Sequence, residues 1–238
     1  MSTAPSERPA ALFVHGAGAG GWEWAIWAEV FGAHGYACRA PDLHPRPMGL
    51  ASTGFGDYLD QLDDWILGCS GPQVVVAASL GALLTLCWLQ RAEAIAVQRI
   101  SRLVLLNPHP ALPEAERMPP PRFSENGVIP WGQRSRLQVN GAVGADEVSA
   151  LRAFRGWRDE SACVLAEARQ QRLDVPIQVP CLWLASQDDE DVPVSLTESL
   201  AKRLGGESMR LQADHISPLI GRGAARTAGL VLSWLSTG

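Results

Sequence analysis

The hydrophobic pattern of this chain alternates between short apolar runs and longer amphipathic stretches. The apolar runs are rich in β-branched residues, which is typical of strands buried on both faces of a sheet. They predict strands over residues 10–14, 36–40, 74–78, 102–106, 181–185 and 208–211. The stretches between them predict helices from near residue 22 and over residues 57–67, 80–97, 194–204 and 224–235. This alternation predicts an α/β fold with a doubly wound, mostly parallel sheet.

The pattern changes between residues 108 and 180. Several prolines punctuate the first part, and helical periodicity returns over 145–171 with an interruption near Gly156. A connection of this length between two sheet strands is usually functional. We therefore expect a helical cap, inserted at about 108–180 into a single domain that spans 1–238. Its aromatic side chains either line a pocket or form the core of the cap. The candidates are Trp131 and Trp157, with Phe123 and Phe154.

Composition indicates a globular protein. Hydrophobic residues make up 47% of the chain and charged residues 19%, and no apolar run is long enough for a membrane span. The formal net charge is −5 and no basic cluster occurs, so nothing marks a surface for nucleic acid or anionic lipid. We expect a soluble protein without a nucleic acid partner and without a membrane span.

Five cysteines are scattered along the chain without a Cys-x-x-Cys pair. Their odd number and apolar surroundings predict buried free thiols in a reducing compartment. Residues 1–9 are polar and lack the apolar core of a secretory signal. These two observations predict a cytoplasmic protein.

A serine lies at the junction between the third predicted strand and the helix after it. The apolar run 74–78 ends at Ser79, and the small residues Ala77 and Gly81 lie two positions to either side. A sharp strand-to-helix turn strains its central residue and requires small neighbours. Such a turn would hold the Ser79 hydroxyl out of the sheet as a nucleophile. A serine before a helix is also an ordinary N-cap, and this alternative stays open at the level of the pattern.

A glycine-rich loop follows the first strand at residues 15–21. Backbone N–H groups in such a loop can bind an anion, either a phosphate or a reaction intermediate. The loop fits Gly-x-Gly-x-x-Gly from Gly16 to Gly21, and Asp42 lies about twenty residues further on, as in a dinucleotide-binding unit. Two tryptophans at the start of the next helix and the proline before Asp42 argue against that alternative.

Both stretches resemble motifs of the α/β-hydrolase family. The nucleophile elbow of that family, Gly-x-Ser-x-Gly, resembles Ala77-Ala78-Ser79-Leu80-Gly81, in which Ala77 replaces the first glycine. The oxyanion loop of the family resembles His15-Gly16-Ala17-Gly18. The Gly-Gly-Trp-x-Trp that follows resembles the branch of plant esterases and hydroxynitrile lyases.

The resemblance implies a role for each of these residues. Ser79 would be the nucleophile, and the backbone N–H groups of Ala17 and Leu80 would form the oxyanion hole. His15 would shape the loop by hydrogen bonding and would not act as a base. The sheet would be of the α/β-hydrolase type, with the cap inserted into it.

A serine nucleophile needs an imidazole to take its proton and a carboxylate to orient that imidazole. In α/β-hydrolases the chain order is nucleophile, acid, histidine, each after a separate strand. Of the five histidines only His215 follows the acidic cluster at 188–191. By this order His215 is the predicted base, and the alternative is a surface histidine in a turn.

The acid of the triad has several candidates in one turn: Asp188, Asp189 and Asp191. The common family pattern has a glycine at the strand end, the acid three residues later and a proline four residues beyond the acid. Ser186, Asp189 and Pro193 keep this spacing, with serine in place of the glycine. The resemblance therefore favours Asp189, and Asp188 is the alternative.

The combined expectation is a serine hydrolase that forms an acyl-enzyme on Ser79 and uses Asp189 and His215. The expected substrate is a small or medium apolar carboxylic ester under the cap, with no cofactor and no metal. The negative net charge argues against coenzyme A thioesters. The same triad also serves thioesterases, C–C hydrolases and lyases, and a hydrolase fold can be a ligand receptor without catalysis. No oligomeric state is predicted.

Overall fold

The computed structural model describes residues 9–119, 126–143 and 146–237. Its centre is a six-stranded sheet in the order β2-β1-β3-β4-β7-β8, and every neighbouring pair is parallel. The strands are β1 (Ala10–Val14), β2 (Ala37–Arg39), β3 (Gln73–Ala78), β4 (Ile100–Leu106), β7 (Cys181–Ser186) and β8 (Glu207–Leu211). Their ends differ from the predicted ones by at most one or two residues. The prediction of a doubly wound parallel sheet is confirmed.

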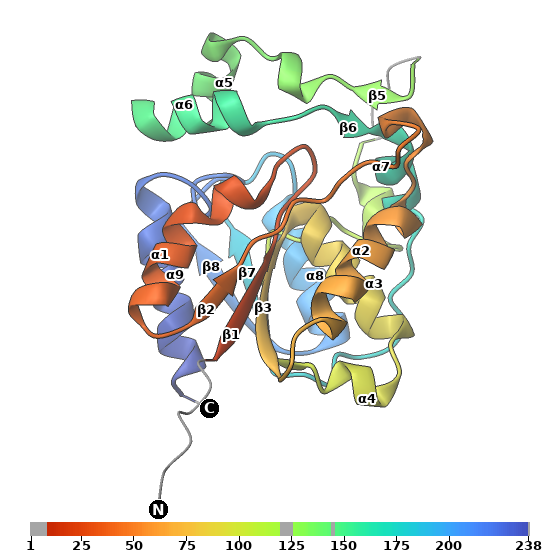
Figure 1. Cartoon of the computed structure of the whole chain (residues 1–238), viewed down its shortest axis with the longest axis vertical. Helices are drawn as coiled ribbons and strands as arrows, with labels where there is room; N and C mark the ends of the chain where they lie inside the picture. The colour runs from red at the N-terminus through yellow and green to blue at the C-terminus, as the bar shows by residue number, and fades with distance from the viewer. Residues whose placement is uncertain (1–8, 120–125, 144–145, 238) are drawn as a thin grey trace, which may run out of the picture.

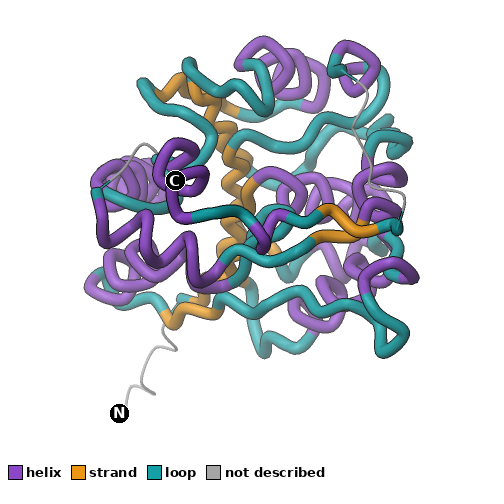
Figure 2. The backbone as a smooth tube through the Cα atoms, turned by 90° about the horizontal axis from the view of Figure 1, so that it is seen from above, coloured by secondary structure: helices purple, strands orange, loops and turns teal. Residues whose placement is uncertain are grey.

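Helices cover both faces of the sheet, because the strand side chains alternate between two hydrophobic clusters. Leu12 and Val14 of β1 belong to one cluster, and Ala11 and Phe13 to the other. The first cluster includes residues of α2 (Phe55–Leu67), α3 (Ser79–Arg91) and α8 (Val194–Leu204). The second includes residues of η1 (Gly21–Trp24), α1 (Ala25–Ala33) and α9 (Arg222–Leu235). Figure 2 shows the strands as a band between these helices.

The sequence predicts one helix over 80–97, and this prediction is wrong. The structure has α3 ending at Arg91 and a short α4 (Ala94–Val97), with an extended Ala92 between them. A helix of 13 residues is about 20 Å long, which matches the length of the six residues of β3. The helix ends because it has run the full length of the sheet, and the chain must then turn back to begin β4.

The inserted segment, residues 107–180, connects β4 to β7. It contains η3 (Glu114–Arg117), β5 (Val128–Ile129), η4 (Trp131–Gln133), α5 (Arg136–Val143), α6 (Glu147–Gly156), β6 (Glu160–Ser161) and α7 (Ala162–Ala168). Figure 1 shows α5, α6, β5 and β6 as a layer beyond the carboxyl ends of the central strands. Helical periodicity predicted structure over 145–171 but missed α5 and the strand β6. Asn140 and Gly141 are poor helix formers, and α5 packs against α6, a contact that its own sequence does not reveal.

The cysteines are free, but only Cys87 and Cys181 are buried. Cys38 and Cys69 are partly buried and Cys163 is exposed, so the prediction of buried thiols is wrong for these three. Cys163 lies on the outer side of α7, whose buried residues are at positions 162, 164 and 168. Within the described ranges, no helix has the length and apolar character needed to cross a bilayer.

Candidate active site

The carboxyl ends of β1 and β3 lie side by side at the point where the strand order of the sheet reverses. The chain leaves β1 for β2 on one side, while β3 lies on the other side of β1. Connecting loops diverge at such a switch point, and α/β proteins usually bind ligands there. Val14 and Ala77 are paired across the two strands. The glycine-rich loop 15–21 and Ser79 therefore emerge next to each other.

Ser79 has a strained backbone. Its φ is 48°, in the left-handed region that residues other than glycine rarely adopt. Ser79 is the first residue of α3, and Ala78 is the N-cap, with no side-chain cap hydrogen bond. The N-cap interpretation of this serine is therefore wrong. The sharp turn between strand and helix that the sequence predicts is present.

Two glycines allow the turn and the loop to approach each other. A Cβ at Gly81 would lie 2.4 Å from the carbonyl oxygen of His15 and 2.7 Å from that of Val14, and backbone atoms cannot move aside easily. A Cβ at Gly16 would lie 3.1 Å from Ser79 Cβ and 3.8 Å from Ser79 Oγ. The glycine-rich loop therefore passes within van der Waals distance of the serine side chain.

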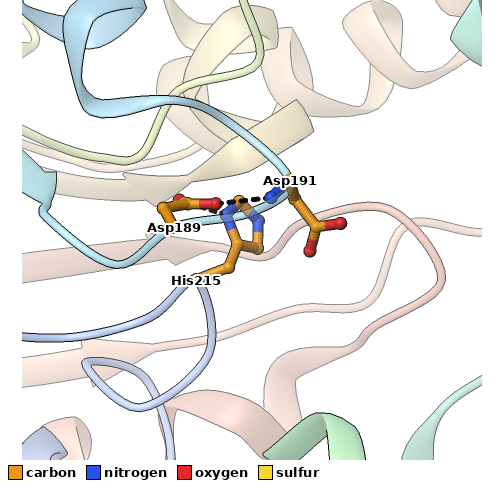
Figure 3. A group of neighbouring side chains, drawn as sticks. All are labelled: Asp189, Asp191 and His215. Carbon is orange, nitrogen blue, oxygen red and sulfur yellow. Dashed lines mark hydrogen bonds and ion pairs between the residues drawn. The ribbon is translucent and has the colours of Figure 1, made fainter. Parts of the chain in front are cut away.

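The Asp189 carboxylate and the His215 imidazole form a hydrogen-bonded pair, in which Asp189 is buried and His215 is partly buried (Figure 3). Asp189 follows β7, His215 follows β8, and His215 Nδ1 lies 2.7 Å from Asp189 Oδ2. Asp189 Oδ1 accepts hydrogen bonds from the N–H groups of Asp191 at 2.9 Å and Val192 at 2.7 Å. Burial lowers the pKa of His215. The hydrogen bond to Asp189 and the negative charges nearby raise it by more than burial lowers it, so the pKa lies above its ordinary value.

The structure separates the candidate acids by burial. The side chain of Asp189 has an exposed fraction of 0%, whereas Asp188 and Asp191 are exposed. One carboxylate oxygen from Asp189, one from Asp191 and a ring nitrogen of His215 lie within 4.8 Å of one another, a spacing that could hold a cation. However, Asp189 already accepts three hydrogen bonds, which a cation would have to displace. The donor set is that of a carboxylate holding an imidazole.

Two further residues place His215 in the neighbourhood of Ser79, although no hydrogen bond joins these two among the described residues. The His109 N–H donates to the Ser79 carbonyl at 3.0 Å, and the His109 ring interacts electrostatically with His215. Glu23 Oε1 accepts a hydrogen bond from Gly16 N at 3.4 Å, and Glu23 also interacts with His215. Hydrogen bonds between catalytic groups are often long in unliganded structures.

His15 shapes the glycine-rich loop, as the resemblance implies. It is buried, its Nδ1 lies 2.8 Å from the carbonyl oxygen of Gly16, and its Nε2 accepts the Leu43 N–H at 2.9 Å. Because Nε2 accepts a hydrogen bond, it carries no hydrogen of its own, and the ring is neutral with its hydrogen on Nδ1. Burial lowers the pKa of His15 to about 4, which keeps the ring neutral.

The N–H groups of Ala17 and Leu80 are both free of partners within the described chain. Leu80 is the second residue of α3, so its N–H has no acceptor inside the helix and lies at the positive end of the helix dipole. No acceptor in the described residues binds the N–H of Ala17, which follows Gly16. Each N–H belongs to a segment that touches Ser79.

The Asp42 carboxylate binds the backbone of the glycine-rich loop. Its Oδ1 accepts the Gly21 N–H at 2.6 Å, and its Oδ2 lies 3.7 Å from Nη1 of Arg158. A dinucleotide-binding unit would need this carboxylate for a ribose hydroxyl. The internal hydrogen bond therefore argues further against the dinucleotide alternative.

The candidate pocket residues belong to the inserted segment, and one of them, Trp131, contacts the loop. Trp131 packs on Gly18, where a Cβ would lie 2.6 Å from Trp131 Cε3. Trp157 is partly buried and packs against the second hydrophobic cluster. The Arg134 guanidinium lies 5.7 Å from the ring centre of Trp131 and 5.5 Å from that of Trp157. Phe154 is 40% exposed, and Phe123 lies outside the described residues.

Sequence reasoning missed two buried carboxylates beside the loop. Glu23 in η1 is 5% exposed, and burial raises its pKa to about 7. Glu160 of β6 is 4% exposed, and burial also raises its pKa. Glu23 lies between two tryptophans in an apolar stretch, which is a detectable signal because glutamate is rarely buried without a partner. Glu160 has no comparable sequence signal.

A sequence model of the family described as "Alpha/beta hydrolase family" matches residues 11–231. No curated protein sequence shows significant similarity to the chain.

Solved structures of the same fold include several enzymes. A pyrethroid hydrolase from Sphingobium faniae JZ-2 has a TM-score of 0.72 at 19% identity, covering 96% of this chain and 97% of the other. Polyneuridine aldehyde esterase has a TM-score of 0.73 at 16% identity, covering 97% and 100%. The thioesterase domain from the curacin biosynthetic pathway has a TM-score of 0.67 at 19% identity, covering 97% and 93%. At these identities the likeness is one of fold. Because the family model spans nearly the whole chain, the chain belongs to the alpha/beta hydrolase family.

Proposed function

We propose that this protein is a serine hydrolase that cleaves small or medium apolar carboxylic esters through an acyl-enzyme on Ser79. The observation that carries the proposal is the left-handed backbone of Ser79 at the end of β3. A strained residue needs a compensating reason, and exposing a nucleophile at a sharp turn is one. The hydrogen-bonded pair of Asp189 and His215 at the same edge of the sheet supports it.

In this mechanism each group has one task. The ionised Asp189 accepts the Nδ1 hydrogen of His215, which leaves Nε2 free to take the proton of Ser79 Oγ as Oγ attacks the ester carbonyl. The N–H groups of Ala17 and Leu80 stabilise the negative oxygen of the tetrahedral intermediate. His215 then gives its proton to the departing alcohol. Water then attacks the acyl-enzyme as His215 takes its proton, and His215 returns this proton to Ser79 Oγ as the carboxylic acid leaves.

The substrate class is inferred from the inserted segment, which we propose acts as a cap within a single domain. Trp131 lies against Gly18 of the loop, so an apolar surface adjoins the groups proposed to act on the carbonyl. Two structures that share the fold are named as a pyrethroid hydrolase and as polyneuridine aldehyde esterase. No step of the proposed mechanism requires a cofactor.

A series of p-nitrophenyl esters from acetate upward, run beside acyl-coenzyme A thioesters, tests this function. Each buried methylene contributes about 0.8 kcal/mol, so kcat/KM should rise roughly fourfold per methylene until the site is filled and then fall. Higher kcat/KM for thioesters than for every oxygen ester would make the protein a thioesterase. Binding of these ligands without turnover would make it a receptor.

One observation favours thioesterase activity as a second candidate. The sequence places no basic residue beside the loop, but the fold brings Arg158 and Arg134 there from the inserted segment. Arg158 is paired with Asp42, whereas Arg134 has no acidic partner among the described residues. A cation at this place would attract an anionic thioester. Arg134→Gln should then lower kcat/KM for acyl-coenzyme A and leave neutral esters unchanged, with the exposed Arg136→Gln as the matched control.

A further inference from the structure

Both backbone groups of Gly18, next to the proposed oxyanion donor Ala17, are hydrogen-bonded to the inserted segment. The Gly18 carbonyl accepts the Arg158 N–H at 2.7 Å, and the Gly18 N–H donates to Glu160 Oε2 at 2.8 Å. These partners are about 140 residues further along the chain, as the separation of 142 between Gly18 and Glu160 shows. The inserted segment therefore fixes the conformation of the glycine-rich loop directly.

Glu160 is itself held firmly. Its Oε1 accepts the Tyr58 hydroxyl at 2.9 Å and the Ser161 N–H at 2.7 Å, and its side chain is buried. Three donors on one buried carboxylate leave it a single orientation, and hydrogen bonds to a charged acceptor are among the stronger ones. Tyr58 comes from α2, so the carboxylate links three parts of the fold: the loop, the inserted segment and α2.

Position 18 of the loop requires glycine, because the contact with the inserted segment leaves no room for a side chain. Gly18 has φ 64°, and a Cβ there would lie 2.6 Å from Trp131 Cε3 and 2.9 Å from the Arg158 carbonyl. Arg158 also donates through Nη2 to the Ala19 carbonyl at 2.5 Å. Contacts on the residue after Ala17 thus restrict the direction in which the Ala17 N–H points.

We propose that Glu160 is a positioning residue that aims the Ala17 N–H at the developing oxyanion by holding Gly18. The proposal rests on the proposed function, since it assumes that the Ala17 N–H stabilises the intermediate. Oxyanion donors accelerate reactions because they are oriented before the charge develops. Loosening the loop should therefore weaken the stabilisation of the transition state more than the binding of the substrate.

Glu160→Gln tests this with little change in size. The carboxamide has one oxygen where the carboxylate has two, so its NH2 group must face the N–H of either Gly18 or Ser161. The matched control is Glu167→Gln in α7, because Glu167 Oε2 accepts the backbone N–H of Phe55 at 2.7 Å, far along the chain from the loop.

The expected result is a fall in kcat of about tenfold or more in Glu160→Gln, because loss of one oxyanion donor costs about 10²-fold to 10³-fold and the loop keeps its other contacts. KM should change by less than about threefold, and the rate at which a fluorophosphonate labels Ser79 should fall with kcat. Glu167→Gln should match the wild type in all three. A folded Glu160→Gln with wild-type kcat and labelling rate would overturn the proposal.

Two measurements keep the outcomes separate. If Glu160→Gln does not fold, Tyr58→Phe removes one of the three donors while leaving the bond to Gly18, and should lower kcat by a few-fold at unchanged KM. Wild-type kinetics in Tyr58→Phe would then count against the proposal. If the wild type neither turns over esters nor reacts with the probe, the proposed function fails. In that case amide hydrogen exchange at Gly18 tests whether Glu160 holds the loop. Faster exchange in Glu160→Gln than in the wild type would support this part of the proposal, and equal exchange would overturn it.

Discussion

The hydrogen bond between Asp189 and His215 determines how activity should depend on pH. The base must be neutral to take the serine proton, and the pKa of His215 is raised above 6.5. The value of kcat/KM should therefore rise with pH along a limb centred above pH 6.5.

Replacing the acid tests the same pair. Asp189→Asn should lower kcat by about 10⁴-fold, because the imidazole loses the charge that orients it and stabilises its protonated form. The limb should also move to lower pH. Asp188→Asn, at an exposed position of the same turn, is the control and should leave both kcat and the limb unchanged. If the two variants exchanged these effects, Asp188 would be the acid.

Glu23 should make the folding stability depend on pH. Burial raises its pKa from 4.5 to about 7, so the folded state disfavours the ionised form. The free energy of unfolding should fall as the pH rises through the window from about 4.5 to 7, by up to about 3 kcal/mol. In Glu23→Gln this contribution should be absent, and the variant should be the more stable protein at pH 8.

Urea unfolding of both proteins from pH 4 to 8 measures the difference. Subtracting the two curves removes the contributions of the other titrating groups, including His15 and His109, whose pKa values are lowered to about 4 by burial. Parallel curves would show that Glu23 is not responsible.

Sequence reasoning found the residues that recur in a motif and missed those placed by burial. Ser79 could be singled out because the elbow pattern depends on neighbouring residues, and His215 because it is the one histidine of the sequence that follows the acidic cluster. The choice of Asp189 over Asp188 needed spacing from a resemblance, and the structure adds the difference in burial. Glu160 could not be found, because its partners Gly18 and Tyr58 are more than 100 residues away.

At the scale of elements, the elbow depends on the close contact between α3 and the end of β1. Gly81→Ala should destabilise the protein by about 3 kcal/mol or more, because the new Cβ would meet the backbone carbonyls of His15 and Val14. Gly229→Ala is the control in the interior of α9, where a Cβ would meet nothing within 4 Å. It should stabilise the protein by up to about 1 kcal/mol. Thermal unfolding of the two variants checks both signs, and a tolerated Gly81→Ala would contradict the described turn.

The central elements were predictable because each strand carries its own signal. Parallel strands buried on both faces need continuous apolar runs, as β3 and β7 have, and the shorter runs at β2 and β8 also became strands. The inserted segment was predictable only in outline. Its helix α5 is weak in isolation and is stabilised by packing on α6, and β6 pairs with β5, which is about 30 residues away, through Ser161 and Val128.

At the scale of the whole molecule, the sheet and the inserted segment together make the site. The strands bring Ser79, Asp189 and His215 to one edge from three separate loops, and the inserted segment holds the glycine-rich loop against that edge. Strand order cannot be read from any one run of residues, so the sequence named the residues of the proposed site but not how they are held.

The most direct test of the central claim is to identify the residue that a fluorophosphonate probe modifies. Because Ser79 is proposed as the activated nucleophile, mass spectrometry of the labelled protein should find the phosphonyl group on the peptide that contains Ser79. Ser79→Ala should abolish labelling and lower kcat by about 10⁴-fold or more. Labelling of a different serine, or labelling and turnover that persist in Ser79→Ala, would contradict the account.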